Sequence, residues 1–390
     1  MNQKEKVSFW SRPVVQSIAA SVLCIIAGLI LGYIVLAVIN AKGAGEAIVT
    51  LLKNFMTYSA PAAQRKYLGN TLVKTAPLLM CALSIQFCYK VGLFNIGAAG
   101  QYVMGSGMAL YAALSLKLPW FLCVLFAVCA GAVWGLIVGI LKAYRNVNEV
   151  ISGIMLNWIG LYLMNMLLTP VKEVASPYTE QVMKMNKAAI LPSLGLGKLF
   201  SNNNYVTIAI PCTIIIAIII WVIQNKTVFG YELRATGLNK DAAKYAGMKG
   251  NKNIILSLMI GGGLAGLGGA FLYLTGFEQW SVTQSSVPGM GFNGIAATFL
   301  GALHPIGTVF SSYFIQHITS GGAYIDKVVY PSQISDLISA IIIYLCAFVL
   351  FFKTFINARI RARQERDLEK VRAMREAEEG SVNREGGEQS

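Results

Sequence analysis

A polar, basic segment at residues 225–253, NKTVFGYELRATGLNKDAAKYAGMKGNKN, lies between two strongly apolar stretches. It contains Arg234 and five lysines but only two acidic residues. Asn239 is a residue type that caps the start of a helix, and Gly247 is one that ends it. Between and beside them, one helical face collects apolar and small residues at positions i, i+4, i+7 and i+8: Leu238, Ala242, Tyr245 and Ala246. A capped amphipathic helix of this kind is suited to binding another protein. The alternative is a basic loop that rests on anionic lipid.

Two glycine-rich segments carry amides inside apolar stretches. GLFNIGAAGQYVMG begins at Gly92, GMGFNGIAATFLG begins at Gly289, and each places Phe-Asn among glycines. Glycine permits a break in a helix, and asparagine can satisfy the backbone groups that a break exposes. Interrupted segments at corresponding places in two halves suggest an internal repeat with a transport pathway at its interface. The alternative is two tight interhelical turns of similar sequence.

Uncharged polar and aromatic residues are therefore the expected lining of such a pathway. The candidates are Phe94, Asn95, Gln101, Asn157, Phe292 and Asn293. Amides and rings of this kind suit a neutral, aromatic, hydroxyl-rich solute. For each residue the alternative is a hydrogen bond between helices.

The sequence lacks the patterns of catalysis. It contains no GxxxxGK[ST] motif, only two histidines, no paired carboxylates and no nucleophile elbow, so we expect no enzyme activity, no metal site, no cofactor and no ATP held by a P-loop. Glu149, Glu278 and Asp336 fall near the ends of apolar stretches, which weakens an ion-coupled carrier without excluding it. The net charge of +14 lies mainly in loops and termini, and no nucleic-acid partner is expected.

The elements that position these residues are membrane helices. The 390 residues are 55% hydrophobic and 13% charged, against about 25% charged in a soluble protein. Runs of 18 or more apolar residues recur along the chain, which predicts an all-α polytopic membrane protein with broken helices near its centre. About ten spans are expected: 17–39, 71–89, 92–115, 118–141, 150–168, 205–224, 254–275, 291–303, 305–321 and 333–352.

Glycines spaced by four suggest close helix packing in lipid. One such face is formed by Gly131, Gly135 and Gly139, and others by Gly28 with Gly32 and Gly262 with Gly266.

The distribution of basic residues predicts the orientation. With the N-terminus inside, cytoplasmic segments hold 21 of the 32 Lys and Arg residues, as the positive-inside rule favours. The expected organisation is a cytoplasmic N-terminus at 1–16, a transmembrane domain at 17–352 and a cytoplasmic tail at 353–390. The tail begins with a basic cluster suited to anionic lipid and continues as a mixed-charge helix that fades into disorder.

At four motifs the chain resembles a known family. GLFNIGAAGQ at 92–101, NEVISGIMLNWIGLYL at 148–163, LRATGLNKDAAKYAGM at 233–248 and GFNGIAATFLGALHPIG at 291–307 resemble permeases of the nucleoside-type branch of ABC importers. The wider group includes simple-sugar and branched-chain amino-acid permeases. The resemblance covers about residues 17–352. Ala99 departs from it, because the nucleoside branch more often has Glu at this position, which puts any role of that carboxylate in gating in doubt.

The resemblance implies a permease subunit in a bacterial cell membrane, with uptake of nucleosides and ATP hydrolysis on a separate cytoplasmic subunit. It also implies a second, related permease subunit and an extracytoplasmic substrate-binding lipoprotein. The segment matching 233–248 is implied to contain the helix that docks on the ATPase. The expected coupling residues are Arg234, Gly237, Asn239, Ala242, Ala243, Tyr245 and Gly247. A simple-sugar or branched-chain amino-acid permease is the alternative within the group, and an ion-coupled carrier is the alternative outside it.

Overall fold

The chain is all-α in the computed structural model, which describes residues 13–326, 328–330 and scattered residues between 337 and 369. Its longer helices are α1 (Pro13–Ile39), α3 (Pro61–Tyr89), α4 (Ala98–Leu114), α5 (Trp120–Arg145), α6 (Glu149–Leu168), α9 (Ala209–Lys226), α12 (Gly250–Tyr273), α13 (Met290–Leu300) and α14 (Pro305–Gly321). Shorter helices join them: α2 (Ala44–Lys53), α7 (Val182–Met185), α8 (Leu196–Leu199), α10 (Val228–Leu238) and α11 (Lys240–Tyr245).

Six of the described helices are long and apolar enough to cross a membrane. They are α1, α3, α5, α6, α9 and α12. Helices α4 and α14 have 17 residues each, and α13 has 11. The prediction of an all-α polytopic membrane protein is confirmed.

Helix α3 is the centre of the bundle. Each residue from Thr75 to Cys88 is buried, which is the pattern of a helix surrounded on all sides. In helices α1 and α9, by contrast, only 22% and 28% of the membrane-spanning window is buried. In the absence of other protein these outer faces contact lipid.

Close packing of α5 and α12 depends on glycine, as the sequence predicts. A Cβ atom on Gly131 would lie 2.2 Å from the carbonyl oxygen of Gly262, and one on Gly135 would lie 2.1 Å from that of Leu258. Helix α4 reaches α12 in the same way, because a Cβ atom on Gly105 would lie 2.2 Å from the Cα atom of Gly266. Backbone contacts of this kind hold helices together in lipid by van der Waals packing.

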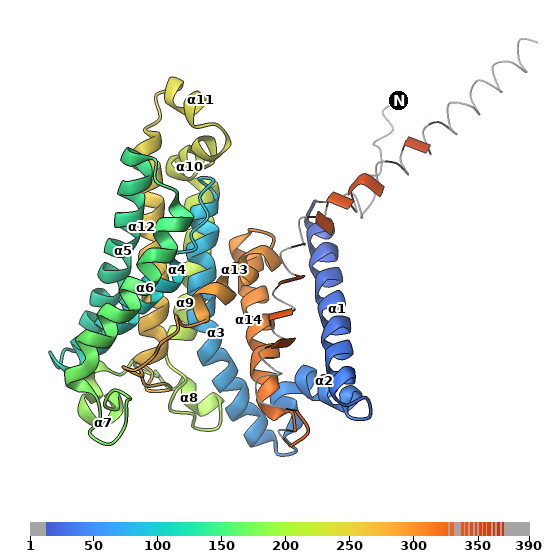
Figure 1. Cartoon of the computed structure of the whole chain (residues 1–390), viewed down its shortest axis with the longest axis vertical. Helices are drawn as coiled ribbons and strands as arrows, with labels where there is room; N and C mark the ends of the chain where they lie inside the picture. Colours follow the sequence, from blue (N-terminus) through green and yellow to red (C-terminus); the bar gives the residue numbers. More distant parts are fainter. Residues whose placement is uncertain are drawn as a thin grey trace, which may run out of the picture.

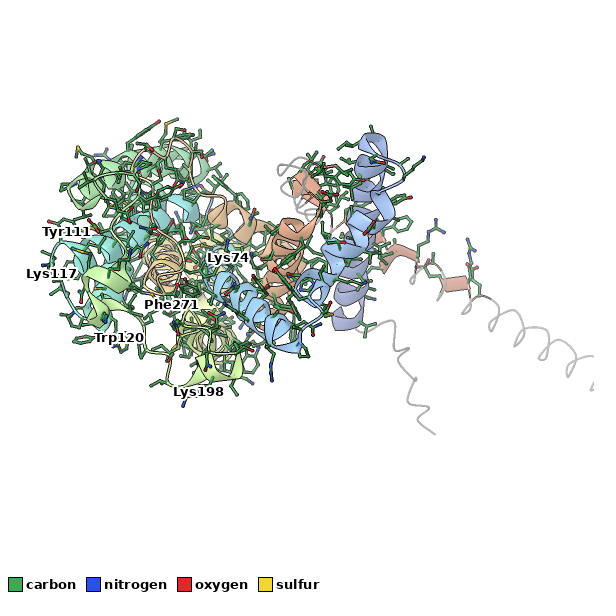
Figure 2. The ribbon with its side chains drawn as sticks, turned by 90° about the horizontal axis from the view of Figure 1, so that it is seen from below. Lys74, Tyr111, Lys117, Trp120, Lys198 and Phe271 are labelled. Atoms are coloured by element: carbon green, nitrogen blue, oxygen red, sulfur yellow. The ribbon has the colours of Figure 1, made fainter. Side chains whose placement is uncertain are left out.

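The short helices lie at opposite ends of the bundle. Figure 1 shows α10 and α11 at one end, called the α11 end below, and α7 and α8 at the other, called the α8 end. Figure 2 looks onto the α8 end, where Lys117 and Lys198 lie. Basic residues therefore occur at both ends.

Several predicted boundaries were wrong. The span predicted at 71–89 begins ten residues earlier, at Pro61, because the polar stretch before it continues the helix. The span predicted to start at residue 92 starts at Ala98, after a turn in which Gly92 has φ +76°. The predicted span 333–352 and the predicted segments 1–16 and 353–390 lie partly or mostly outside the described residues.

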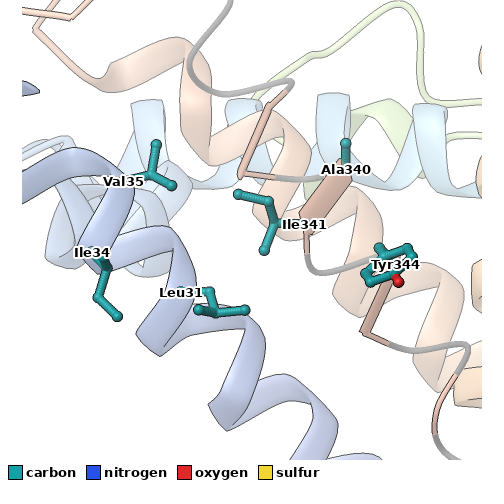
Figure 3. Close-up of a pocket in the computed structure, with 6 residues that line it drawn as sticks. All are labelled: Leu31, Ile34, Val35, Ala340, Ile341 and Tyr344. Atoms are coloured by element: carbon teal, nitrogen blue, oxygen red, sulfur yellow. The ribbon is translucent and has the colours of Figure 1, made fainter. Parts of the chain in front are cut away.

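An apolar pocket of about 370 Å³ lies between α1 and the residues Ala340, Ile341 and Tyr344. Figure 3 shows its lining: Leu31, Ile34, Val35, Ala340, Ile341 and Tyr344. A second apolar pocket, of about 450 Å³, lies between α4 and α5. Neither pocket includes any of the expected pathway residues.

Candidate functional site

The coupling segment, defined here as residues 227–249, folds as two helices. The helix expected between Asn239 and Gly247 is α11, which starts at Lys240, and it is preceded by α10, which ends at Leu238. The break occurs because Asn239 adopts an extended conformation and its side chain accepts hydrogen bonds from the amides of Asp241 and Ala242. This is the N-cap predicted from the sequence. Gly247 follows α11 with φ +83°, a conformation that glycine adopts without strain.

Three contacts fix the coupling segment to the bundle. The Thr227 hydroxyl donates a hydrogen bond to the Ile223 carbonyl at 2.6 Å, which joins the segment to α9. The Asn253 side chain donates to the Thr236 hydroxyl at 3.0 Å in a buried position, which joins α10 to α12. At Gly237 a Cβ atom would lie 2.4 Å from the Lys90 carbonyl oxygen, so α10 also packs directly on the α3–α4 turn.

The opposite side of the coupling segment is bare. Leu238 is 89% exposed and Tyr245 is 94% exposed. Ala242 and Ala246 are exposed beside them. The spacing assigned these four residues to one face of a single helix, but Leu238 ends α10, whereas Ala242, Tyr245 and Ala246 lie in or directly after α11. The four residues share their exposure and are called the apolar patch below. An apolar surface that is held rigidly and left uncovered is characteristic of a protein interaction site.

The other expected coupling residues differ in their surroundings. Arg234, Gly237 and Asn239 are exposed, whereas Ala243 is buried, with 4% of its surface accessible. A Cβ atom on Gly247 would meet no atom within 4 Å. The structure therefore divides the set: Gly237 and Ala243 face the bundle, and Tyr245 and Ala242 face outward.

The expected pathway amides meet at the α3–α4 break. The Asn95 and Gln101 side chains form a reciprocal pair, with N···O distances of 2.9 and 3.1 Å, and Asn95 also donates to the Ser84 hydroxyl. Asn157 accepts from the Gly100 amide at 2.7 Å and donates to the Ile96 carbonyl at 3.1 Å. All three amides are buried, and these bonds fix the start of α4 against α6. This arrangement matches the alternative of hydrogen bonds between helices.

The second glycine-rich segment is less interrupted than expected. Phe292 and Asn293 lie in the first turn of α13, and the irregular backbone precedes and follows that helix. A Cβ atom on Gly291 would lie 2.4 Å from the Cα atom of Ala99, so the starts of α13 and α4 touch. The structure thus brings the two glycine-rich segments together. The internal repeat stays a prediction.

The expected aromatic residues lie on the same side of the bundle. The Phe94 ring lies 6.4 Å from that of Phe299 on α13, and Phe292 is 38% exposed. Phe94 is half-buried. Both expected aromatic residues are therefore associated with α13: Phe292 belongs to it, and Phe94 lies near its Phe299.

One face of α6 is unusual among the exposed faces. Trp158 and Tyr162 lie near the middle of the helix, 42% and 57% exposed, with ring centroids 6.2 Å apart and planes inclined by 25°. The other residues of this face are Ile151, Ile154, Met155, Ile159, Leu163 and Met166. The exposed face of α9 is aliphatic by contrast, with isoleucines and one valine: Ile214, Ile215, Ile218, Ile219 and Val222.

Sequence reasoning missed the polar contacts that join distant elements. Gln86 and Gln224 form a buried reciprocal amide pair between α3 and α9, at 2.9 Å in both directions. Lys74 on α3 forms an ion pair with Glu278 at 2.9 Å, and Lys74 is labelled in Figure 2. The signal that was available is the presence of glutamine and lysine inside predicted spans, since such residues need partners there.

The loops of the α8 end are joined by hydrogen bonds. Trp280 is fully buried and donates from its indole nitrogen to Asn165 at 2.9 Å. Glu173 accepts hydrogen bonds from Ser176 and Gln279. These two bonds lower the pKa of the Glu173 carboxyl below its ordinary value.

The arrangement is that of a polytopic membrane protein. It is a bundle of membrane helices with two short helices held at one end and a bare apolar patch on them. The chain belongs to the family described as the permease component of the branched-chain amino acid transport system, whose model matches residues 67–347.

Curated relatives agree with this family. The chain is 34% identical over 287 residues to the guanosine ABC transporter permease protein NupP of Bacillus subtilis, covering 72% of this chain and 81% of the relative. It is 34% identical over 289 residues to the nucleoside ABC transporter permease protein NupB of Lactococcus lactis, covering 72% and 79%. It is 29% identical over 297 residues to the glucose ABC transporter permease protein TsgB13 of Haloferax volcanii, covering 74% and 78%. No solved structure matches the chain.

The chain is thus a permease, the translocation component of an ABC transporter, and a multi-pass membrane protein.

Proposed function

We propose that this permease takes up nucleosides, driven by ATP hydrolysis on a separate cytoplasmic subunit. The apolar patch on the coupling segment is the observation that supports binding of a separate ATPase subunit. Leu238 and Tyr245 are almost fully exposed on helices that Thr236 and Gly237 fix to the bundle. A surface attached in this way can transmit a partner's movement to the membrane helices. The choice of nucleosides rests on the names of NupP and NupB, the two relatives at 34% identity.

The pathway that we propose lies between this chain and a second permease subunit. Both described pockets are apolar, and neither is lined by the expected pathway residues. The amides of Asn95, Gln101 and Asn157 form hydrogen bonds inside the chain. The exposed face of α6, with Trp158 and Tyr162, supports a pathway shared between two subunits. We propose that Phe94 and Phe292 also line this pathway. The three amides would then hold the backbone around it in place.

The proposed setting is a bacterial cell membrane with both termini cytoplasmic, so that the α11 end faces the ATPase. The α8 end then faces an extracytoplasmic substrate-binding lipoprotein. We assign two roles to the expected coupling residues. Those that contact the ATPase or shape the contacting surface are Arg234, Asn239, Ala242, Tyr245 and Gly247. Those that attach the segment to the bundle are Gly237 and Ala243.

Uptake of labelled nucleosides tests the substrate. Cells with and without the gene are compared for uptake of guanosine, glucose and leucine, with the ATP-binding subunit co-expressed. We expect gene-dependent uptake of guanosine, inhibited by unlabelled nucleosides. Gene-dependent uptake of glucose alone would instead favour a sugar permease, the second candidate, to which the relative TsgB13 points. Uptake that persists without the ATP-binding subunit would favour an ion-coupled carrier.

A further inference from the structure

Three basic residues from three separate segments lie around the end of α3. Lys90 follows the last residue of α3. Gly237 packs on the Lys90 carbonyl, so Arg234, one helical turn earlier on α10, lies over the same turn. Gln86, one turn before Lys90, donates to the Leu303 carbonyl at 2.9 Å, which places His304 beside the same helix end. This group of Lys90, Arg234 and His304 is called the basic cluster below.

The basic cluster has no acidic partner in the described part of the chain. The ion pairs there are Lys74 with Glu278 and Lys142 with Glu149. Glu232 and Asp241, the acidic residues of the coupling segment, form no ion pair with the cluster. Lys90 is half-buried, and Arg234 and His304 are exposed. Like charges held close together repel each other, and an anion between them relieves that repulsion.

The electrostatics agree with the geometry. Burial, and then the nearby Arg234 charge, lower the pKa of the Lys90 ammonium below its ordinary value. Burial, and then the Lys90 charge, lower the pKa of His304. Lys90 therefore lies close enough to both Arg234 and His304 for their charges to interact with it.

We propose that the basic cluster is a receptor site for one carboxylate of the ATP-binding partner subunit. The site rests on the proposed function, since it requires that partner. Charge complementarity favours a carboxylate, because a guanidinium and an ammonium form strong, charge-assisted hydrogen bonds with it. The site is also continuous with the apolar patch, since Leu238 lies one turn beyond Arg234 on α10.

A carboxylate bound there would connect three elements at once. Arg234 belongs to the coupling segment, Lys90 to the turn before α4, and His304 to the turn between α13 and α14. A partner that bound only the apolar patch would contact the coupling segment and no other element. The receptor site would therefore carry movement of the partner directly to α4 and α13, the helices whose starts touch at Ala99 and Gly291.

Zero-length cross-linking tests the site. The purified complex of permease and ATP-binding subunit is treated with a water-soluble carbodiimide at pH 7 and analysed by peptide mass spectrometry. Because the pKa of Lys90 is lowered, more of its amine is in the neutral, nucleophilic form than for an ordinary lysine. We expect an amide link between the Lys90 side chain and an Asp or Glu of the ATP-binding subunit, and its loss in Lys90→Arg.

Affinity measurements provide the second readout. Lys90→Gln and Arg234→Gln should each weaken binding of the ATP-binding subunit about tenfold, the usual effect of losing a charge-assisted hydrogen bond. Lys252→Gln is the matched control, because Lys252 is an exposed lysine at the same end of the bundle, on the first turn of α12. It should bind like the wild type.

Three results would overturn the receptor site. The first is wild-type affinity in Lys90→Gln and Arg234→Gln together with no link from Lys90. The second is a link from Lys90 to acidic residues of the chain's own tail, such as Glu378, which would make that tail the occupant. The third is failure of the wild-type permease to bind any ATP-binding subunit, which overturns the proposed function as well and is recognised by the absence of the complex.

Discussion

Gly237 packs directly against the backbone of Lys90: a Cβ atom at residue 237 would lie 2.4 Å from the Lys90 carbonyl oxygen and 3.0 Å from the Gly92 amide nitrogen. The obstacle is backbone rather than a flexible side chain, so it cannot move aside without shifting the α3–α4 turn. The coupling segment can therefore lie this close to the start of α4 only because residue 237 has no side chain.

Gly237→Ala should therefore separate α10 from the α3–α4 turn. Overpacking of this kind costs about 1–3 kcal/mol, and we expect reduced uptake with normal insertion in the membrane. Gly289→Ala is the control, because a Cβ atom there meets nothing within 4 Å. Uptake assays on both variants check the prediction, and equal uptake would show that the close approach has no role in coupling.

The sequence predicted those parts of the structure that depend on local chemistry. Hydropathy located the membrane helices, and Asn239 and Gly247 marked the ends of α11 because a cap and a positive φ are properties of single residues. The glycine faces of α5 and α12 were predicted for the same reason. In each case the residue type by itself restricts the backbone.

Features that depend on tertiary contacts were not predictable. Helix α10 was missed because its residues include glycines and charges, and its place is set by Asn253 and Lys90, which are distant in sequence. An amide inside a span does not reveal whether it faces a pathway or another helix. Asn95 and Gln101 pair with each other, and only the fold shows that.

Two neighbouring glycines of α12 should respond differently to alanine. A Cβ atom on Gly262 would lie 2.2 Å from the Gly131 carbonyl oxygen, whereas one on Gly263 would lie 3.4 Å from a Val128 side-chain carbon. Gly262→Ala should lower the free energy of unfolding in detergent by about 1–3 kcal/mol. Gly263→Ala should leave that free energy nearly unchanged. Thermal unfolding of the two purified variants measures this difference. A similar loss in both would mean that α5 and α12 adjust freely.

The Asn95–Gln101 pair should behave as a unit. Asn95→Leu leaves the Gln101 amide buried without its partner, and Gln101→Leu does the same to Asn95, each costing about 1–3 kcal/mol. Changing both removes the unpaired groups together, so the double variant should be destabilised by less than the sum of the single variants. Thermal unfolding of the four proteins forms the cycle. Strict additivity would indicate that the two amides act independently.

The proposed orientation places Ser193 outside and Asn239 inside. Ser193 precedes α8, and Asn239 joins α10 to α11, at the opposite end of the bundle. Single cysteines at these positions, in a cysteine-free background, are treated with a membrane-impermeant thiol reagent on intact cells. The cysteine at residue 193 should be labelled, and that at residue 239 only after the cells are opened. The reverse pattern would invert the orientation and place the coupling segment away from any cytoplasmic ATPase.

The last prediction concerns Trp158 and Tyr162 on α6. The indole nitrogen of Trp134 donates to the Leu156 carbonyl, and that of Trp280 donates to Asn165. The indole nitrogen of Trp158, near the middle of a membrane-crossing helix, has no hydrogen-bond partner among the described residues, and neither has the Tyr162 hydroxyl. Indole and phenol groups in lipid prefer the interface, where their polar ends reach water. The α6 face therefore suits a partner subunit or a hydrated pathway better than the centre of a bilayer.

Trp158→Leu and Tyr162→Leu should reduce the maximal rate of nucleoside uptake, because leucine keeps the apolar surface but removes the flat ring and its hydrogen-bonding group. Trp158→Phe should retain more activity, since a ring remains for stacking. Phe310→Leu is the matched control: Phe310 is an aromatic residue on α14 that is 72% exposed. Co-purification of the second permease subunit is measured for each variant, which separates loss of assembly from loss of transport. If Trp158→Leu and Phe310→Leu transport equally well in intact complexes, the α6 face is covered by lipid and the proposed pathway lies elsewhere.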